Sequence, residues 1–214
     1  MRIVLVGKGL MGKVFYHRYK SEIVAWVDSD SELKELNIQS DVLVDFSRPS
    51  MINAIINYIK EENIPSVIAK TGYSSLEEKE IVEASKYIAI CKDSNFSFGM
   101  LKVKEIVKMI SENFNGQINL TETHHINKKD APSGTALSIR KIIQDQDRDV
   151  KIISVRKGNE VGKHVIKYTF ENEIIEIKHQ VISKDVFAEG AYNATKHILK
   201  KKRGLFSYKE VLDE

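Results

Sequence analysis

Two periodicities of hydrophobic and polar positions alternate along the first ninety or so residues. Short runs of apolar, often β-branched residues predict strands at 2–6, 23–27, 41–45, 66–69 and 87–90. Between them, stretches with a helical period predict helices at about 11–20, 49–61 and 76–86. Strands that alternate with helices in this way indicate a parallel sheet covered by helices on both faces.

The pattern changes after Asn95. A helix is predicted at 100–113, a strand at 117–124 and another helix at about 133–145. A strand at 151–155 and two alternating runs at 165–170 and 174–181 follow, and the two runs predict a β-hairpin. The tail, from about 184 to 199 and on to 214, is predicted to be helical. We therefore expect an α/β protein, with a Rossmann-like parallel-sheet domain and a smaller α+β domain that contains a mixed sheet.

The composition narrows the class of protein. Of 214 residues, 42% are hydrophobic and 29% are charged, which is typical of soluble globular proteins rather than disordered or membrane proteins. The net charge of +3 is too small to favour nucleic acid as a partner. The start of the chain lacks the pattern of a signal peptide, and no apolar run approaches the length of a membrane span. Cys91 is the single cysteine, so we expect a cytoplasmic protein without an intrachain disulfide.

A glycine loop follows the first predicted strand. Gly7-Lys-Gly9-Leu-Met-Gly12 has the GxGxxG spacing between a strand and a helix, and Asp28 closes the second strand. Such glycines allow a tight turn, close approach of a pyrophosphate and close helix packing, although a purely structural glycine turn is the alternative. A carboxylate at position 28 can accept a hydrogen bond from a ribose hydroxyl and would repel a 2′-phosphate. The loop therefore favours NADH, while Lys8 and Lys70 leave NADPH open.

A second loop concentrates groups that suit acid/base chemistry. Residues 122–136 carry His124 and His125, two lysines and a Ser-Gly-Thr turn that begins a helix, where backbone N–H groups can bind a carboxylate. Adjacent histidines on a strand point to opposite faces, so no metal site is expected. A Ser-His-Asp hydrolase is disfavoured because Ser133 lacks a nucleophile-elbow context. Glu122 either orients the loop or is exposed.

The stretch Glu122-Thr-His-His-Ile-Asn-Lys-Lys-Asp-Ala-Pro-Ser-Gly-Thr-Ala136 resembles the signature of the 4-hydroxy-tetrahydrodipicolinate reductase (dihydrodipicolinate reductase) family. Supporting similarities are Asp45-Phe-Ser-Arg-Pro49, Thr71-Gly72, Asn95-Phe-Ser97, Ser154-Val-Arg-Lys-Gly158 with Val161-Gly162, and Gly204-Leu-Phe206. The resemblance covers nearly the whole chain. It implies NAD(P)H-dependent reduction of a cyclic dicarboxylate in lysine and diaminopimelate biosynthesis. It also implies a dinucleotide-binding domain of residues 1–96 with about 190–214, a substrate-binding and tetramerisation domain of residues 97–189, and a homotetramer.

The resemblance also assigns roles to individual residues. His124 is expected to be the general acid/base and Lys128 the proton donor. The residues expected to bind the dicarboxylate are His125, Lys128, Ser133, Gly134 and Thr135. The residues expected to contact the cofactor are Gly7, Lys8, Gly9, Leu10, Met11, Gly12, Asp28, Ala69, Lys70, Thr71, Asp93, Ser94, Asn95 and Phe96.

Some positions depart from the family pattern. Leu10 stands where the family usually has arginine, which weakens the case for NADPH, and Lys70 stands where it usually has threonine. Two other functions remain open at this point. One is a different NAD-dependent amino-acid or keto-acid dehydrogenase, and the other is a dinucleotide-sensing module without catalysis.

Overall fold

A computed structural model describes residues 1–213 and divides the chain into two compact units. The first unit contains Met1–Phe96 and the segment from Asp185 onward, and the second contains Ser97–Lys184. The chain thus returns to the first unit at Asp185 and not at about residue 190. The reason is that helix α7 begins at Asp185, and Ala188 in its first turn is already buried in the core of the first unit.

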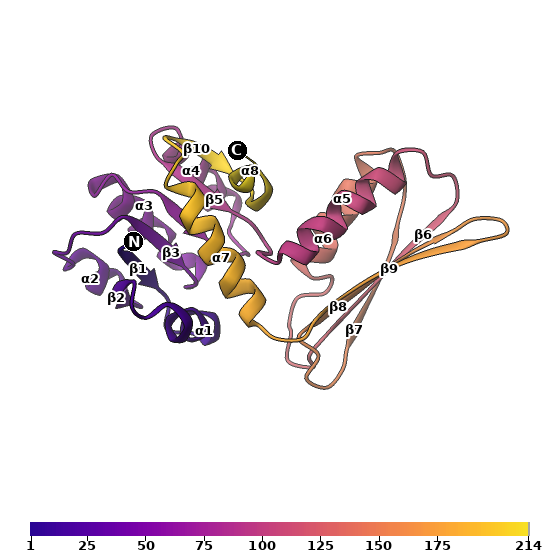
Figure 1. The fold of residues 1–214 in the computed structure, drawn as a ribbon, viewed down its shortest axis with the longest axis horizontal. Helices are drawn as coiled ribbons and strands as arrows, with labels where there is room; N and C mark the ends of the chain where they lie inside the picture. The colour runs from indigo at the N-terminus through magenta and orange to yellow at the C-terminus, as the bar shows by residue number, and fades with distance from the viewer. Residues whose placement is uncertain (214) are drawn as a thin grey trace. The chain divides into compact units, whose positions relative to one another are not determined.

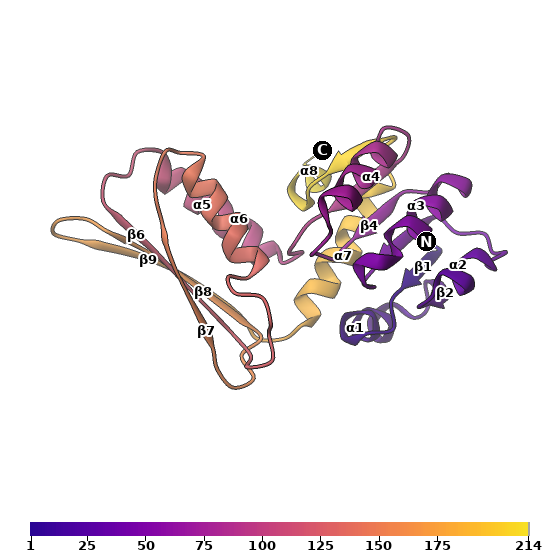
Figure 2. The same cartoon turned by 180° about the vertical axis from the view of Figure 1, so that it is seen from behind.

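The first unit is built on a six-stranded parallel sheet with the order β10-β5-β4-β3-β1-β2 (Figures 1 and 2). Its strands are β1 (Ile3–Val6), β2 (Ile23–Val27), β3 (Val42–Asp45), β4 (Ser66–Ile68), β5 (Ala89–Lys92) and β10 (Gly204–Phe206). Strands β1, β3 and β4 are buried along their whole length, as expected for parallel strands covered on both faces. The prediction of a Rossmann-like parallel sheet is confirmed.

Helices cover both faces of this sheet. One face packs against α1 (Leu10–Tyr19), α7 (Asp185–Ile198) and α8 (Tyr208–Leu212). The other packs against α2 (Asp30–Lys34), α3 (Ile52–Glu61), which follows a short 3₁₀ turn at Pro49–Met51, and α4 (Ser75–Ser85). In α3, isoleucines three and four residues apart form one buried stripe, which fixes the side that faces the sheet.

Three features of the first unit differ from the predicted elements. Helix α2 was not predicted, because its five residues contain a single apolar side chain, Leu33, and therefore carry almost no periodic signal. The tail is not helical throughout, since Gly204–Phe206 forms the edge strand β10 beside β5. Strand β5 begins at Ala89 and not at Tyr87, because α4 ends in a turn that leaves the Tyr87 ring exposed.

The second unit is a four-stranded mixed sheet with two helices on one face (Figures 1 and 2). Its strands, in the order β7-β6-β8-β9, are β6 (Gln117–His124), β7 (Lys151–Arg156), β8 (Gly162–Thr169) and β9 (Ile174–Val181). Strands β6 and β7 are parallel and the other pairs antiparallel, so the predicted β8–β9 hairpin and mixed sheet are confirmed. Helices α5 (Phe98–Glu112) and α6 (Gly134–Gln144) pack on a core that includes Leu120, Ile139 and Ile166.

Candidate active site

Strand β6 ends in two ionisable side chains on the same face. Glu122 and His124 are two residues apart, so both point toward the side that carries the helices. Glu122 is completely buried and His124 is only 9% exposed. The Glu122 carboxylate accepts hydrogen bonds from His124 Nδ1, from Arg156 Nη2 at 2.9 Å and from the Ser133 backbone N–H at 3.3 Å. Of the two interpretations left open for Glu122, exposure is wrong.

These contacts influence the ionisation states of Glu122 and His124. Burial raises the pKa of Glu122, but its hydrogen bonds with Arg156 and His124 outweigh burial and hold the pKa below the usual value. Burial also lowers the pKa of His124, and the hydrogen bond with Glu122 only partly counters this. The pair is therefore a carboxylate beside a neutral imidazole at neutral pH, which is a suitable starting state for a general base.

The loop after β6 is held by Arg156 at the end of β7. Arg156 Nε donates to the Lys128 carbonyl at 3.3 Å, and Arg156 Nη2 donates to the Asp130 carbonyl. The Lys128 ammonium group lies 2.7 Å from Asp130 Oδ1, and this pairing, against the effect of burial, lowers the pKa of Asp130. Arg156 was not among the predicted site residues. It lies in the Ser154–Gly158 motif. The sequence pattern of that motif does not predict which of its side chains contacts the loop after β6.

Helix α6 begins beside this pair. Ser133 is the N-cap, and its hydroxyl accepts a hydrogen bond from the Ala136 N–H at 3.2 Å. The N–H groups of Gly134 and Thr135 lie in the first turn, where a helix offers no internal acceptor. Such a turn can bind a carboxylate. The structure therefore brings Ser133 into direct contact with Glu122, and places Gly134 and Thr135 in the turn that follows.

His164 and Gly162, both on β8, complete the surroundings of His124. The His164 ring stands edge-on to His124 with ring centroids 5.4 Å apart, and burial lowers the pKa of His164 to about 4. A Cβ on Gly162 would lie 3.3 Å from His124 Nε2. The missing side chain thus leaves space beside this nitrogen. His125 follows the last residue of β6 and is partly exposed.

The glycine loop of the first unit has the close contacts that its spacing predicts. Gly7 has φ +105°, and a Cβ there would lie 2.6 Å from the Phe46 carbonyl carbon. A Cβ on Gly12 would lie only 1.9 Å from the Gly7 carbonyl oxygen. A Cβ on Gly9, in contrast, would meet no described atom within 4 Å. Gly9 is the N-cap of α1 and has no capping side chain, so the start of α1 is open to an anion and fits a dinucleotide pyrophosphate.

Two carboxylates stand at the end of β2. Asp28 accepts a hydrogen bond from the Lys8 backbone N–H at 2.8 Å. Glu32 accepts one from the Asp28 N–H at 2.6 Å and pairs with the Lys8 ammonium group at 3.3 Å. Glu32 was not predicted because it belongs to the short helix α2, which places it beside Asp28.

The ends of β4 and β5 carry the other expected cofactor contacts. Ala69, Lys70 and Thr71 follow β4, and Asp93, Ser94 and Asn95 follow β5. The carboxyl ends of parallel strands are the usual ligand edge of such a sheet. Phe96 is buried and packs against Tyr208, so in this structure its ring belongs to the core.

Sequence reasoning missed the polar interior of the β3 end. Asp45 is completely buried and accepts hydrogen bonds from the Ser47 N–H at 2.7 Å and the Tyr73 hydroxyl at 3.2 Å. Burial raises the pKa of this carboxyl group, and its hydrogen bonds only partly oppose the rise. The link joins the loop after β3 to the loop after β4, so the two loops are braced together at the ligand edge.

Comparison with known proteins identifies the family. The N-terminal sequence model of dihydrodipicolinate reductase matches residues 1–96, and the C-terminal sequence model matches residues 99–212. The chain belongs to the dihydrodipicolinate reductase family. The resemblance inferred from the sequence is therefore confirmed, and the chain is an enzyme of this oxidoreductase family.

Relatives match the whole chain. The 4-hydroxy-tetrahydrodipicolinate reductase of Brachyspira hyodysenteriae is 35% identical over 99% of this chain and 100% of its own length. That of Thermosipho africanus is 35% identical over 100% of this chain and 99% of its own length. A dipicolinate-bound dihydrodipicolinate reductase from Paenisporosarcina has the same fold, with a TM-score of 0.80, 17% identity and 99% coverage of both chains. A myo-inositol dehydrogenase from Corynebacterium glutamicum is similar in fold alone, with a TM-score of 0.67 and 12% identity over 99% of this chain and 92% of its own.

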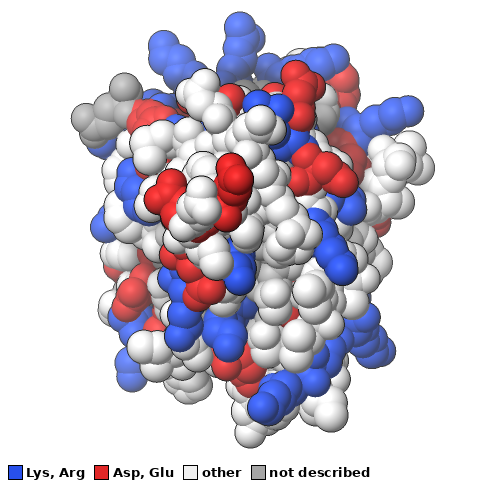
Figure 3. All heavy atoms as spheres, turned by 90° about the vertical axis from the view of Figure 1, so that its right-hand side faces the viewer, with Lys and Arg blue, Asp and Glu red and all other residues white. Residues whose placement is uncertain are grey.

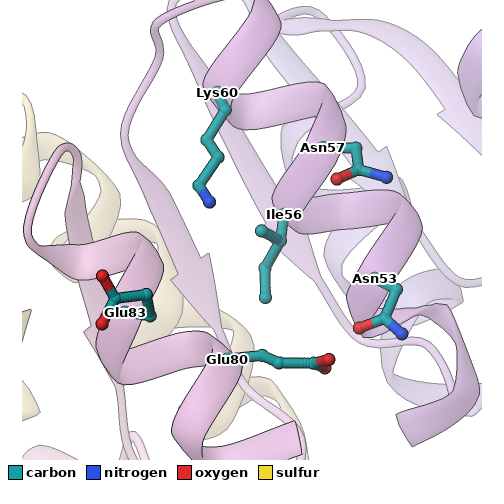
Figure 4. Close-up of a pocket in the computed structure, with 6 residues that line it drawn as sticks. All are labelled: Asn53, Ile56, Asn57, Lys60, Glu80 and Glu83. Carbon is teal, nitrogen blue, oxygen red and sulfur yellow. The ribbon is translucent and has the colours of Figure 1, made fainter.

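The described residues also form a cavity outside the family motifs. An open cavity of about 360 Å³ lies between α3 and α4 (Figure 4). It is lined by Asn53, Ile56, Asn57, Lys60, Glu80 and Glu83, and it includes neither the glycine loop nor the histidine loop of residues 122–136. Positive and negative side chains are interspersed over most of the face drawn in Figure 3. Residues 1–213 contain no group of three or more His, Cys, Asp or Glu placed to hold a metal ion. Within the same residues, no helix is both long and apolar enough to cross a membrane.

Proposed function

We propose that this chain reduces 4-hydroxy-tetrahydrodipicolinate with a nicotinamide dinucleotide, as the names of its relatives state for them. The observation that carries the proposal is the buried Glu122–His124 pair, which stands beside Gly162 and the start of α6 in a chain of this family. A dehydrogenase of another substrate class and a sensing module would share the glycine loop. Neither function would explain the hydrogen-bonded Glu122–His124 pair in the second unit.

The second unit would bind and protonate the substrate. Lys128 supplies a positive charge, the first turn of α6 supplies the N–H groups of Gly134 and Thr135, and the N-cap Ser133 supplies its hydroxyl group for a carboxylate. His125 is the remaining expected substrate ligand. Lys128, as an ammonium group, can donate the proton that must accompany hydride addition, and the neutral His124 can accept a proton at Nε2 in the same reaction.

The first unit would hold the dinucleotide. Gly7, Gly9 and Gly12 let the start of α1 meet the pyrophosphate, and Asp28 accepts from a ribose hydroxyl. The loops after β4 and β5 lie at the edge where the nicotinamide end is expected. When bound, a reduced nicotinamide supplies the hydride, and the protein supplies position and charge.

We expect turnover with both cofactors and a preference for NADH. The carboxylates of Asp28 and Glu32 would repel a 2′-phosphate, while the Lys8 ammonium is already paired. Because these groups are partly exposed and screened by salt, we expect a roughly tenfold preference in kcat/KM, or about 1.4 kcal/mol. Oxidation of NADH and NADPH at 340 nm, with substrate generated in situ by dihydrodipicolinate synthase, measures it.

The matched variants for this assay are Glu32→Gln and Glu35→Gln. Glu32→Gln should narrow the gap between the cofactors, whereas Glu35→Gln, at an exposed position just after α2, should leave it unchanged. Folded wild-type protein that oxidises neither cofactor would contradict the proposed function. A preference for NADPH would contradict only the role given to the two carboxylates.

We also propose a homotetramer formed through the sheet of the second unit. No described helix packs on the face opposite α5 and α6, and exposed apolar residues such as Ile153 and Ile174 lie on the edge strands β7 and β9. Such an apolar surface is typical of a subunit interface. Light scattering should give four times the chain mass of 24.4 kDa, and a mass of one chain would refute the assembly.

A further inference from the structure

Glu122 lies wholly inside the second unit, although glutamate is rarely buried without partners. We propose that Glu122 is a positioning residue for the reduction: it holds His124 in the tautomer with the proton on Nδ1 and leaves Nε2 as the reacting nitrogen. This inference rests on the proposed function of His124 as the acid/base group. It adds a residue that need not touch the substrate.

The donors around Glu122 fix its orientation. Arg156 Nη2 and the Ser133 N–H both reach Oε1, and neither group can accept a hydrogen bond. Oε1 therefore accepts two hydrogen bonds. The other oxygen, Oε2, faces His124 Nδ1. An ionised carboxylate only accepts hydrogen bonds, so His124 Nδ1 must carry the proton.

The other ring nitrogen faces the space that Gly162 leaves. A Cβ at that position would lie 3.3 Å from Nε2 and 3.5 Å from Cδ2, which is a tight contact. With the proton on Nδ1, Nε2 presents a lone pair to this space. The edge-on ring of His164 supports the imidazole from β8. Glu122 thus fixes the tautomer of His124, and His164 fixes the orientation of its ring. Gly162 leaves space beside Nε2.

The charged groups near His124 act on its pKa in opposite directions. Glu122, on the same strand, raises it, whereas Lys128 in the loop and Arg156 on β7 lower it. Removal of the Glu122 charge should therefore move the pKa of His124 downward. The other titratable groups near this cluster are His164 on β8, His179 on β9 beside His164, and Asp130 in the loop.

Glu122→Gln is the sharpest variant because it keeps the shape and removes the charge. Arg156 and the Ser133 N–H require the amide oxygen on their side, so the NH₂ group must face His124 Nδ1. That arrangement favours the opposite tautomer, with the proton on Nε2, and should lower kcat roughly 10²–10⁴-fold. The limb of the pH profile that His124 controls should move to lower pH, which a merely structural role would not cause.

Two further measurements keep the proposal falsifiable. Nitrogen NMR of histidine-labelled wild-type protein should show His124 protonated at Nδ1 at neutral pH, whether or not the variant folds. Dinucleotide binding of Glu122→Gln should match wild type, although its melting temperature should fall because Arg156 loses its carboxylate partner. Glu112→Gln, at an exposed position on α5, should retain full activity. A wild-type His124 protonated at Nε2 would overturn the proposal, and so would an active Glu122→Gln with an unmoved pH limb. An inactive wild type would count against the proposed function instead, and the NMR result would still decide the tautomer.

Discussion

Replacement of His124 by alanine should lower kcat roughly 10²–10⁴-fold, the usual contribution of a positioned acid/base group. Dinucleotide binding should survive, because the glycine loop belongs to the other compact unit. The fold should also survive. His124 stands at the end of β6, and alanine removes a ring that stands edge-on to His164 and hydrogen bonds to Glu122. Steady-state kinetics with NADH, together with a binding titration of the same cofactor, measure both expectations.

Lys128→Ala should affect both substrate binding and proton donation. Loss of a charge-assisted hydrogen bond to a carboxylate costs about 1.5–3 kcal/mol, so KM should rise by roughly one to two orders of magnitude. Loss of the proton donor should also lower kcat, and a kcat equal to that of wild type would limit Lys128 to substrate binding. Lys129→Ala is the matched control, because Lys129 is the exposed neighbouring lysine. Full activity in the His124→Ala, Lys128→Ala double variant would refute both roles.

The sequence was most informative where spacing and function coincide. The glycine loop could be located from the chain because its close backbone contacts require glycine at Gly7 and Gly12. Strand β6 and its histidine loop were equally visible, since eight alternating residues end in a run of chemically active groups. A strong local pattern was sufficient in both cases.

The missed features depend on contacts between distant segments. Arg156 reaches Glu122 across 34 residues, and the direction of its side chain depends on the parallel pairing of β6 with β7. The edge strand β10 exists because β5 offers it a pairing edge, and its own three residues carry no strand signal. Glu32 belongs to the candidate site only because α2 places its carboxylate beside Asp28, where it accepts a hydrogen bond from the Asp28 N–H. Periodicity cannot reveal such relations, because each is set by tertiary packing.

Gly12→Ala should strongly destabilise the first unit. The new Cβ would lie 1.9 Å from the Gly7 carbonyl oxygen, so the start of α1 must move away from β1. Gly7 cannot yield, since its own Cα lies against the Phe46 backbone and its carbonyl accepts from Trp26 Nε1 at 2.9 Å. We expect a loss of about 3 kcal/mol or more and a fall in melting temperature of roughly 6–12 °C.

Gly9→Ala separates cofactor binding from folding in the same loop. Its Cβ would enter space that no described atom occupies, so the melting temperature should stay at the wild-type value. If that space receives the pyrophosphate, the same methyl group should weaken NADH binding roughly tenfold or more, equivalent to about 1.4 kcal/mol. Thermal melts and cofactor titrations of the two variants test this difference. Unchanged NADH affinity in Gly9→Ala would mean that the glycine loop has only a structural role, which is the alternative that its spacing left open.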